Sequence, residues 1–218
     1  MRKLSDSEKV EAIRRASANS TYQVEIVEAD LLKPSSWPNA LKNVTLVIHM
    51  ASPVPTLNAS NDENYFIKPA VEGTLNVLNA AYDANVRRVV LTSSLAAMVP
   101  NFSNPEYLSG NKSIDESVRT NINAPNTSAY AKSKLRAEDA AWNFVKGKRN
   151  QTGKCFDLAV INPSYVFGPT FQNTASSISS TAKTFKSLLE VANSSAKPDN
   201  LYIVSCDVRG EYPPTIQS

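Results

Sequence analysis

The chain has 218 residues, of which 42% are hydrophobic and 20% are charged, which is typical of a globular domain and excludes a fibrous or disordered chain. Its 23 basic and 20 acidic residues are scattered along the sequence, which argues against a nucleic-acid partner. No apolar run is long enough to span a bilayer, and the amino terminus lacks the apolar segment of a signal peptide. The two cysteines have no metal-ligand spacing, so we expect no metal site. Since two cysteines also fit a reducing compartment better than a disulfide scaffold, we expect a cytoplasmic protein without a membrane partner.

The first predicted elements are a helix and two strands. Ser5 and Glu8 have the spacing of a capping box, which predicts a helix over about residues 6–18. YQVEIVEAD, residues 22–30, alternates between apolar and polar residues like a strand. VTLVIHMAS, residues 44–52, is a nearly continuous apolar run, which is the pattern of a strand buried on both faces of a parallel sheet.

The rest of the chain continues the alternation of helices and strands. Pro69 is predicted to open a helix, because proline is favoured at the first helical position. The later predicted elements are the strand RRVVLTSS, a polar loop from Pro100 to Pro125, a helix containing TSAYAKSK, the strand FDLAVINP, a helix through Thr184 to Val191 and the strand LYIVSCDV. This order predicts an α/β fold with a parallel sheet.

In the segment TSAYAKSK, Tyr130 precedes Lys134 by about one helical turn. This spacing is common by chance, so the pair could simply be helix surface. Both residues lie in line with Ala137 and Ala141, however, and a lysine that only solvates a helix belongs on its polar side. An ammonium beside a phenol lowers the phenol pKa from about 10 and makes it a usable proton donor. The pair is therefore predicted to be catalytic.

A serine near this pair could complete the chemistry. The residues TSS, 92–94, end a predicted strand, where a hydroxyl can donate a hydrogen bond to a carbonyl oxygen that gains negative charge. Ser93 and Ser94 could also be ordinary hydroxyls at a strand end. His49, the only histidine, is interpreted as structural, and Gly73 as a helix position chosen for close packing.

Six segments in order, VIHMASP, VEGTLNVLNAA, RRVVLTSS, IDES, YAKSK and INPSYVFGP, resemble the short-chain dehydrogenase/reductase superfamily in its extended branch. The similarity is greatest to dihydroflavonol reductase-like proteins of the NAD-dependent epimerase/dehydratase family, and it covers most of residues 1 to about 209. It implies a Rossmann-like parallel sheet flanked by helices. Residues 1–165 would form an incomplete dinucleotide-binding domain, and residues 166–218 part of a substrate-binding region.

The resemblance also implies roles for individual residues. Ser94 would be the catalytic serine, Tyr130 the general acid, and Lys134 the residue that lowers the Tyr130 pKa and holds the nicotinamide ribose. The other cofactor-binding residues that it implies are Arg2 at the 2′-phosphate, Asp30 and Leu31 beside the adenine, Ala51 and Ser52 at the end of the segment 44–52, Thr92, and Pro163 and Val166 beside the carboxamide.

The chain lacks the glycine-rich turn that receives the pyrophosphate in such sites, because none of its six glycines has the required spacing. The expected fold therefore lacks the first βα unit, begins about one βαβ unit late and is also short at its carboxyl end. Residues 22–28 are expected to stand apart or to pair with residues 44–51.

The predicted function is NADP-dependent reduction of a small ketone or aldehyde, with NADPH as the cofactor and NAD as the alternative, and with little or no activity in this form of the chain. Two other classes stay open. One is a non-catalytic truncated product or a binding module that uses the same pocket, and the other is an epimerase or dehydratase of the nucleotide-sugar type. The sequence predicts neither the identity of the carbonyl substrate nor an oligomeric state.

Overall fold

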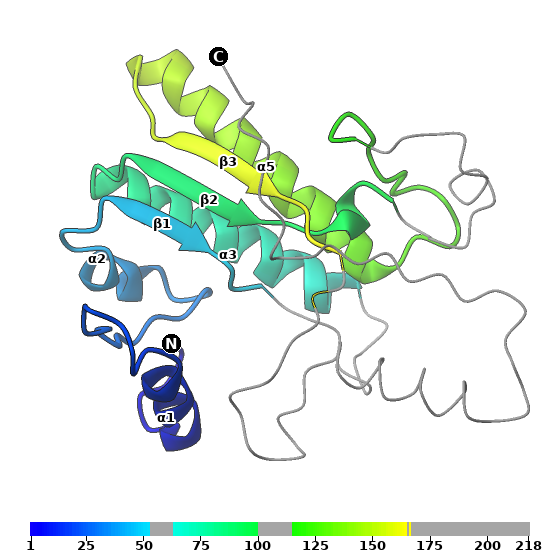
Figure 1. Ribbon diagram of the computed structural model, residues 1–218. Helices are drawn as coiled ribbons and strands as arrows, with labels where there is room; N and C mark the ends of the chain where they lie inside the picture. Colours follow the sequence, from blue (N-terminus) through cyan, green and yellow to red (C-terminus); the bar gives the residue numbers. More distant parts are fainter. Residues whose placement is uncertain (53–62, 100–114, 165, 167–218) are drawn as a thin grey trace, which may run out of the picture.

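The computed structural model describes residues 1–52, 63–99, 115–164 and 166. Figure 1 shows the arrangement of these parts. The elements in chain order are α1 (Ser7–Ala16), the 3₁₀ turn η1 (Pro34–Ser36), α2 (Trp37–Ala40), β1 (Leu46–His49), α3 (Glu63–Asp83), β2 (Arg88–Thr92), the 3₁₀ turn η2 (Leu95–Ala97), α5 (Ala129–Thr152) and β3 (Asp157–Ile161). Within the described ranges, no helix is long and apolar enough to cross a membrane.

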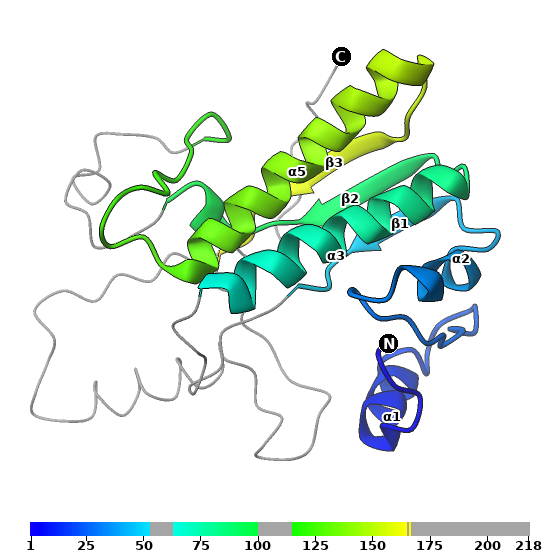
Figure 2. The same ribbon diagram turned by 180° about the vertical axis from the view of Figure 1, so that it is seen from behind.

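The three strands form one parallel sheet in the order β1-β2-β3. Leu46 pairs with Arg88 at the start of β1, and Thr92 pairs with Ile161 at the end of β2. Helices α3 and α5 lie side by side on one face of the sheet, behind the strands in Figure 1 and in front of them in Figure 2. The predicted Rossmann-like α/β fold is confirmed.

The core fills the space between these two helices and the sheet. Small residues such as Ala81 and Ala141 allow close packing there, and Val89 in the central strand is fully buried. The buried residues of this core are Leu41, Val47, Val77, Leu78, Ala81, Val86, Val89, Leu91, Ala141, Val145 and Phe156. Gly73 lies where α3 meets the preceding segment, because a Cβ atom there would come within 2.9 Å of Leu31 Cβ. The prediction that Gly73 serves close packing is confirmed.

The prediction that the strand at residues 44–52 is buried on both faces is wrong. Val47 and His49 face α3 and α5 and are buried, whereas Leu46 and Ile48 point away from the helices and are 63% and 69% exposed. The physical reason is that both covering helices lie on the same face of the sheet (Figure 2). No helix in the described part of the chain covers the other face.

The predicted strand at residues 22–30 does not form. The segment stands apart from β1, whose pairing partner is β2. The segment forms two backbone hydrogen bonds with Met1. The Met1 amino group donates to the Val27 carbonyl at 2.6 Å, and the Ala29 N–H donates to the Met1 carbonyl at 2.8 Å. An alternating sequence without a neighbouring strand has no ladder to join, so its backbone stays irregular.

Two further predictions concern the starts of helices. The predicted helix at 6–18 is confirmed as α1, but its cap is Asp6, whose carboxylate accepts from the Lys9 N–H, and not Ser5. The prediction that Pro69 opens a helix is wrong, because α3 already begins at Glu63 and contains Pro69 inside.

The predicted strands that correspond to β2 and β3 and the predicted helix that corresponds to α5 are confirmed. The helix predicted at 184–191 and the strand predicted at 201–208 lie outside the described residues.

Candidate active site

Helix α5 carries the Tyr-x-x-x-Lys segment at its amino-terminal end. Ser128 caps the helix, since its hydroxyl accepts from the Ala131 N–H at 3.1 Å. Tyr130 lies in the first turn and is half-buried. Lys132, two residues later, forms an ion pair with Glu63 at the start of α3, so its charge is already compensated.

Lys134 is buried one turn further along α5. The residue is only 6% exposed, and its ammonium nitrogen lies 5.7 Å from the centre of the Tyr130 ring. Burial lowers the Lys134 pKa from 10.5 to about 8, because the charged form loses its hydration. Among the described residues, no carboxylate forms an ion pair with this ammonium. Within the described part of the chain, Lys134 is therefore a buried cation without a carboxylate counterion, which is costly in free energy.

His49 lies on the neighbouring strand end. It is the last residue of β1 and is 4% exposed. Its pKa is lowered from 6.5 to about 4, first by burial and second by the positive charge of Lys134. A neutral imidazole beside Lys134 agrees with the structural role predicted for His49 and adds no second charge to the site.

The end of β2 supplies the hydroxyl groups of Thr92 and Ser94 in addition to that of Ser93. Ser94 caps the turn η2, and its Oγ accepts from the Ala96 N–H at 3.2 Å. This contact uses a lone pair, so the hydroxyl proton of Ser94 stays available for donation. The Thr92 Oγ1 atom is buried and has no hydrogen-bond partner among the described residues, which is uncommon for a buried hydroxyl and makes it a candidate contact for a ligand.

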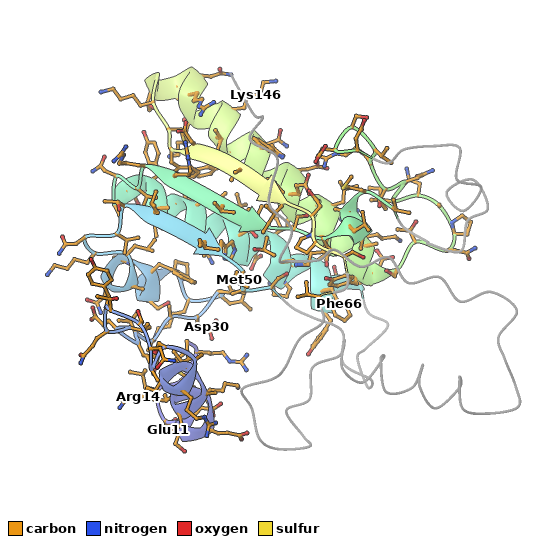
Figure 3. The ribbon with its side chains drawn as sticks, in the orientation of Figure 1. Glu11, Arg14, Asp30, Met50, Phe66 and Lys146 are labelled. Atoms are coloured by element: carbon orange, nitrogen blue, oxygen red, sulfur yellow. The ribbon has the colours of Figure 1, made fainter. Side chains whose placement is uncertain are left out.

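The carboxyl ends of the three parallel strands meet at one edge of the sheet, which is where open α/β sheets bind ligands. Ala51 and Ser52 follow β1 at this edge, and Pro163 follows β3, where its carbonyl accepts from the Leu95 N–H at 2.9 Å. Figure 3 shows Met50 and Phe66 toward this end of the sheet and Lys146 at the other end of α5. The exposed Val166 comes shortly after Pro163.

The structure thus gathers most of the predicted site residues at the strand ends, but Arg2, Asp30 and Leu31 lie in the amino-terminal part. The Leu31 carbonyl accepts from Asn76 of α3 at 2.7 Å. The Asp30 carboxylate accepts from the Leu32 N–H at 2.9 Å, so its position is fixed by its own turn. Arg2 is exposed. The contacts of these three residues with the adenine and 2′-phosphate stay predictions.

The sequence analysis missed three residues beside the site, namely Glu138, Asn162 and Arg119. Glu138 of α5 is buried and binds Ser93, Asn162 and Arg119. A signal was present in the sequence, because Glu138 follows Lys134 by four residues and so shares its side of the helix. Nothing comparable marks Arg119, which comes from an irregular segment.

A parallel Rossmann-like sheet with a buried lysine one turn after a tyrosine, next to the ends of its strands, defines the class of short-chain dehydrogenases/reductases. The chain belongs more narrowly to the 3-beta hydroxysteroid dehydrogenase/isomerase family, whose profile matches residues 3–206. This agrees with the resemblance seen in the sequence and makes the chain a member of a family of NAD(P)-dependent oxidoreductases.

Individual relatives are reductases. The chain is 41% identical over 153 residues to cinnamoyl-CoA reductase 1 of Petunia hybrida, covering 68% of this chain and 41% of that protein. It is 34% identical over 211 residues to a putative NADPH-dependent methylglyoxal reductase of Candida albicans, covering 93% of this chain and 59% of that protein. The structure of yeast methylglyoxal/isovaleraldehyde reductase Gre2 with NADPH superposes with a TM-score of 0.66 at 27% identity, over 87% of this chain and 57% of that one. The chain spans about half the length of the curated relatives that it matches.

Proposed function

We propose that this chain carries the catalytic centre of an NADPH-dependent reductase that converts a small ketone or aldehyde to an alcohol. The observation that carries the proposal is the buried Lys134 ammonium beside the Tyr130 ring, without a carboxylate partner among the described residues. Two similar proteins support the choice of cofactor, because one is named as an NADPH-dependent reductase and another was solved with NADPH.

The residues at the strand ends fit the nicotinamide half of this cofactor. The Lys134 ammonium is buried without a carboxylate counterion among the described residues, and within the same residues the buried Thr92 hydroxyl has no hydrogen-bond partner. Ribose hydroxyls would bind both groups. Ser52 would lie along the cofactor, and Pro163 and Val166 beside its carboxamide. When bound, the nicotinamide supplies the hydride for the carbonyl carbon.

The protein groups handle the proton. Tyr130 donates its phenolic proton to the carbonyl oxygen, and the Lys134 ammonium stabilises the phenolate that remains. Ser94 donates a hydrogen bond to the same oxygen while negative charge develops there. A positioned general acid of this kind contributes about 10²–10⁴-fold to the rate.

Affinity for NADPH is expected to be weak in the 218-residue chain. Tight pyrophosphate binding depends on backbone N–H groups at a glycine-rich turn, and no glycines in this sequence have that spacing. The contacts on the nicotinamide side would remain. We expect a dissociation constant on the order of 1 mM, which corresponds to about 4 kcal/mol, and no measurable carbonyl reduction by this chain alone.

Titration of the purified chain with NADPH tests the proposal without a need for turnover. His49 is the only histidine and lies close enough to Lys134 to be influenced by its charge, so its ring signal in an NMR spectrum reports binding at the site. We expect a saturable shift of this signal in the wild-type chain and in Lys132→Ala, and none in Lys134→Ala. Lys132→Ala is the matched control, because it removes a neighbouring ammonium that is paired with Glu63.

Two results would count against the proposal. The first is an NADPH-induced shift that persists in Lys134→Ala, which would separate this lysine from the cofactor. The second is a wild-type His49 signal that does not respond at millimolar NADPH. Tight binding would instead mean that another segment provides the phosphate contacts.

A further inference from the structure

Helix α5 contains a buried carboxylate that has no role in the proton transfer described above. Glu138 is 4% exposed and lies one turn beyond Lys134, on the helix side that faces the strand ends. Burial of a carboxylate is costly unless hydrogen bonds or an opposite charge compensate for the lost hydration. The surroundings of Glu138 provide both.

Three donors converge on this carboxylate. Its Oε2 atom accepts from the Ser93 hydroxyl at 2.6 Å and from the Asn162 side-chain amide at 3.0 Å. Its Oε1 atom accepts from the Arg119 guanidinium in an ion pair. Ser93 follows β2, Asn162 follows β3, and Arg119 comes from the segment before α5. Glu138 therefore links the ends of two strands and one irregular segment to a single point on the helix.

These links surround Ser94 on both sides. Ser93, the preceding residue, is fixed by its hydroxyl on Glu138. The second N–H of the Asn162 amide donates to the Ser94 carbonyl at 3.2 Å, so one side chain bridges Glu138 and the Ser94 backbone. In the described part of the chain, the Ser94 hydroxyl itself is oriented by its contact with the Ala96 N–H. Its direction therefore depends on how firmly the backbone at residues 93–96 is held.

The irregular segment is fixed on the same turn. The Thr120 N–H donates to the Ala97 carbonyl at 2.9 Å, and the Thr120 hydroxyl donates to the Ala96 carbonyl at 2.8 Å. These bonds hold Arg119 next to Glu138, where its guanidinium also pairs with Asp139. The Arg119 guanidinium thus compensates the charge of the buried Glu138 carboxylate next to the start of the turn η2, which Ser94 caps.

We propose that Glu138 is a positioning residue that holds the Ser94 hydroxyl in its donating orientation by tying the ends of β2 and β3 to α5. This inference rests on the role proposed for Ser94. Because the proposal concerns the geometry of Ser94 and the turn η2, it can be tested on the 218-residue chain without cofactor or substrate.

The test compares three variants with the wild-type chain by NMR. Glu138→Met keeps a similar side-chain length but removes every acceptor, Glu138→Gln keeps one acceptor oxygen, and Asp139→Asn is the control that alters only the exposed partner of Arg119. Two quantities are measured. One is the set of Hα–Hβ couplings of Ser94, which report whether its side chain keeps one rotamer. The other is hydrogen exchange of the Leu95 and Ala96 amides, which donate to Pro163 and Ser94.

In Glu138→Met we expect averaged Ser94 couplings and exchange at Leu95 and Ala96 that is faster by about tenfold or more. Glu138→Gln should recover part of both effects, and Asp139→Asn should resemble the wild type. Exchange at Val89, in the buried centre of β2, separates local release from global destabilisation. If Glu138→Met is too unstable to study, Glu138→Gln carries the same comparison.

Unchanged Ser94 couplings and unchanged exchange in both Glu138 variants would overturn the inference. So would acceleration at Leu95 and Ala96 that only parallels Val89, because Glu138 would then be a stability residue. Either failure would leave the proposed roles of Tyr130 and Lys134 untouched, since NADPH titration tests those separately.

Discussion

Lowering the pH from neutral to about 4 is expected to destabilise the fold through His49. The His49 pKa is about 4 in the folded chain, compared with 6.5 for an ordinary histidine. The folded state therefore binds the proton more weakly than the unfolded state, and protonation favours unfolding. The contribution of His49 to stability is complete above about pH 6.5 and is lost as the pH falls toward 4.

The magnitude follows from the difference between the two pKa values. Each tenfold difference in proton affinity corresponds to about 1.4 kcal/mol, so His49 accounts for a loss of about 3 kcal/mol across this pH range. Because His49 is the only histidine, its ring signal can be followed through an acid titration without ambiguity. Urea unfolding at pH 7 and pH 4.5, with His49→Gln for comparison, gives the matching free energies of unfolding.

We expect the wild-type chain to lose more stability than His49→Gln between these pH values. In Lys134→Met the His49 pKa should rise but stay below 6.5, because burial is the larger cause of its shift and the lysine charge the smaller one. A His49 signal that titrates near 6.5 in the folded chain would refute this reasoning. An equal loss of stability in the wild type and His49→Gln would do the same.

Three further predictions follow from burial and packing. Lys134 should make the fold more stable as the pH rises from about 8 to 10.5, by a few kcal/mol at most, and urea unfolding of Lys134→Met should lack this rise. Gly73→Ala should destabilise the fold by about 1–3 kcal/mol through overpacking. Gly147→Ala, where the added methyl group has open space around it, should stabilise the fold by up to about 1 kcal/mol. Equal melting temperatures for the two variants would contradict this prediction. Ile48→Thr, on the exposed face, should change stability by less than about 0.5 kcal/mol, whereas Val47→Ala on the buried face should cost about 2 kcal/mol, as measured by urea unfolding.

Local signals in the sequence were sufficient for much of this fold. The strands at β2 and β3 are short apolar runs next to helices with clear periodicity, so their type follows from neighbouring residues alone. Close packing at Gly73 was also predictable, because a glycine inside a helix can allow a close approach of another segment. Gly147 of α5, which has open space around it, shows that this does not hold for every helical glycine. Tyr130 and Lys134 could be found because their spacing puts them on the apolar side of α5.

Features that depend on distant partners were not predictable in this way. Residues 22–30 alternate like a strand, but a strand forms only beside another strand. The exposure of Leu46 and Ile48 depends on where two helices pack, which the run VTLVIHMAS does not encode. The partners of Glu138 come from three separate segments, so its hydrogen bonds become visible only in the folded chain.

Turnover by a hybrid enzyme tests the central claim most directly, namely that Tyr130 donates the proton and Lys134 serves both the cofactor and the rate. In the hybrid, residues 1–164 replace the matching segment of the putative NADPH-dependent methylglyoxal reductase of Candida albicans, and methylglyoxal reduction and NADPH affinity are measured together. We predict an active hybrid in which Tyr130→Phe lowers kcat by about 10²–10⁴-fold while the NADPH dissociation constant changes by less than about twofold. Lys134→Ala should weaken both quantities. Substantial residual reduction by Tyr130→Phe, an equal loss of NADPH affinity in the two variants, or a folded hybrid that binds NADPH but does not reduce the carbonyl would contradict the account.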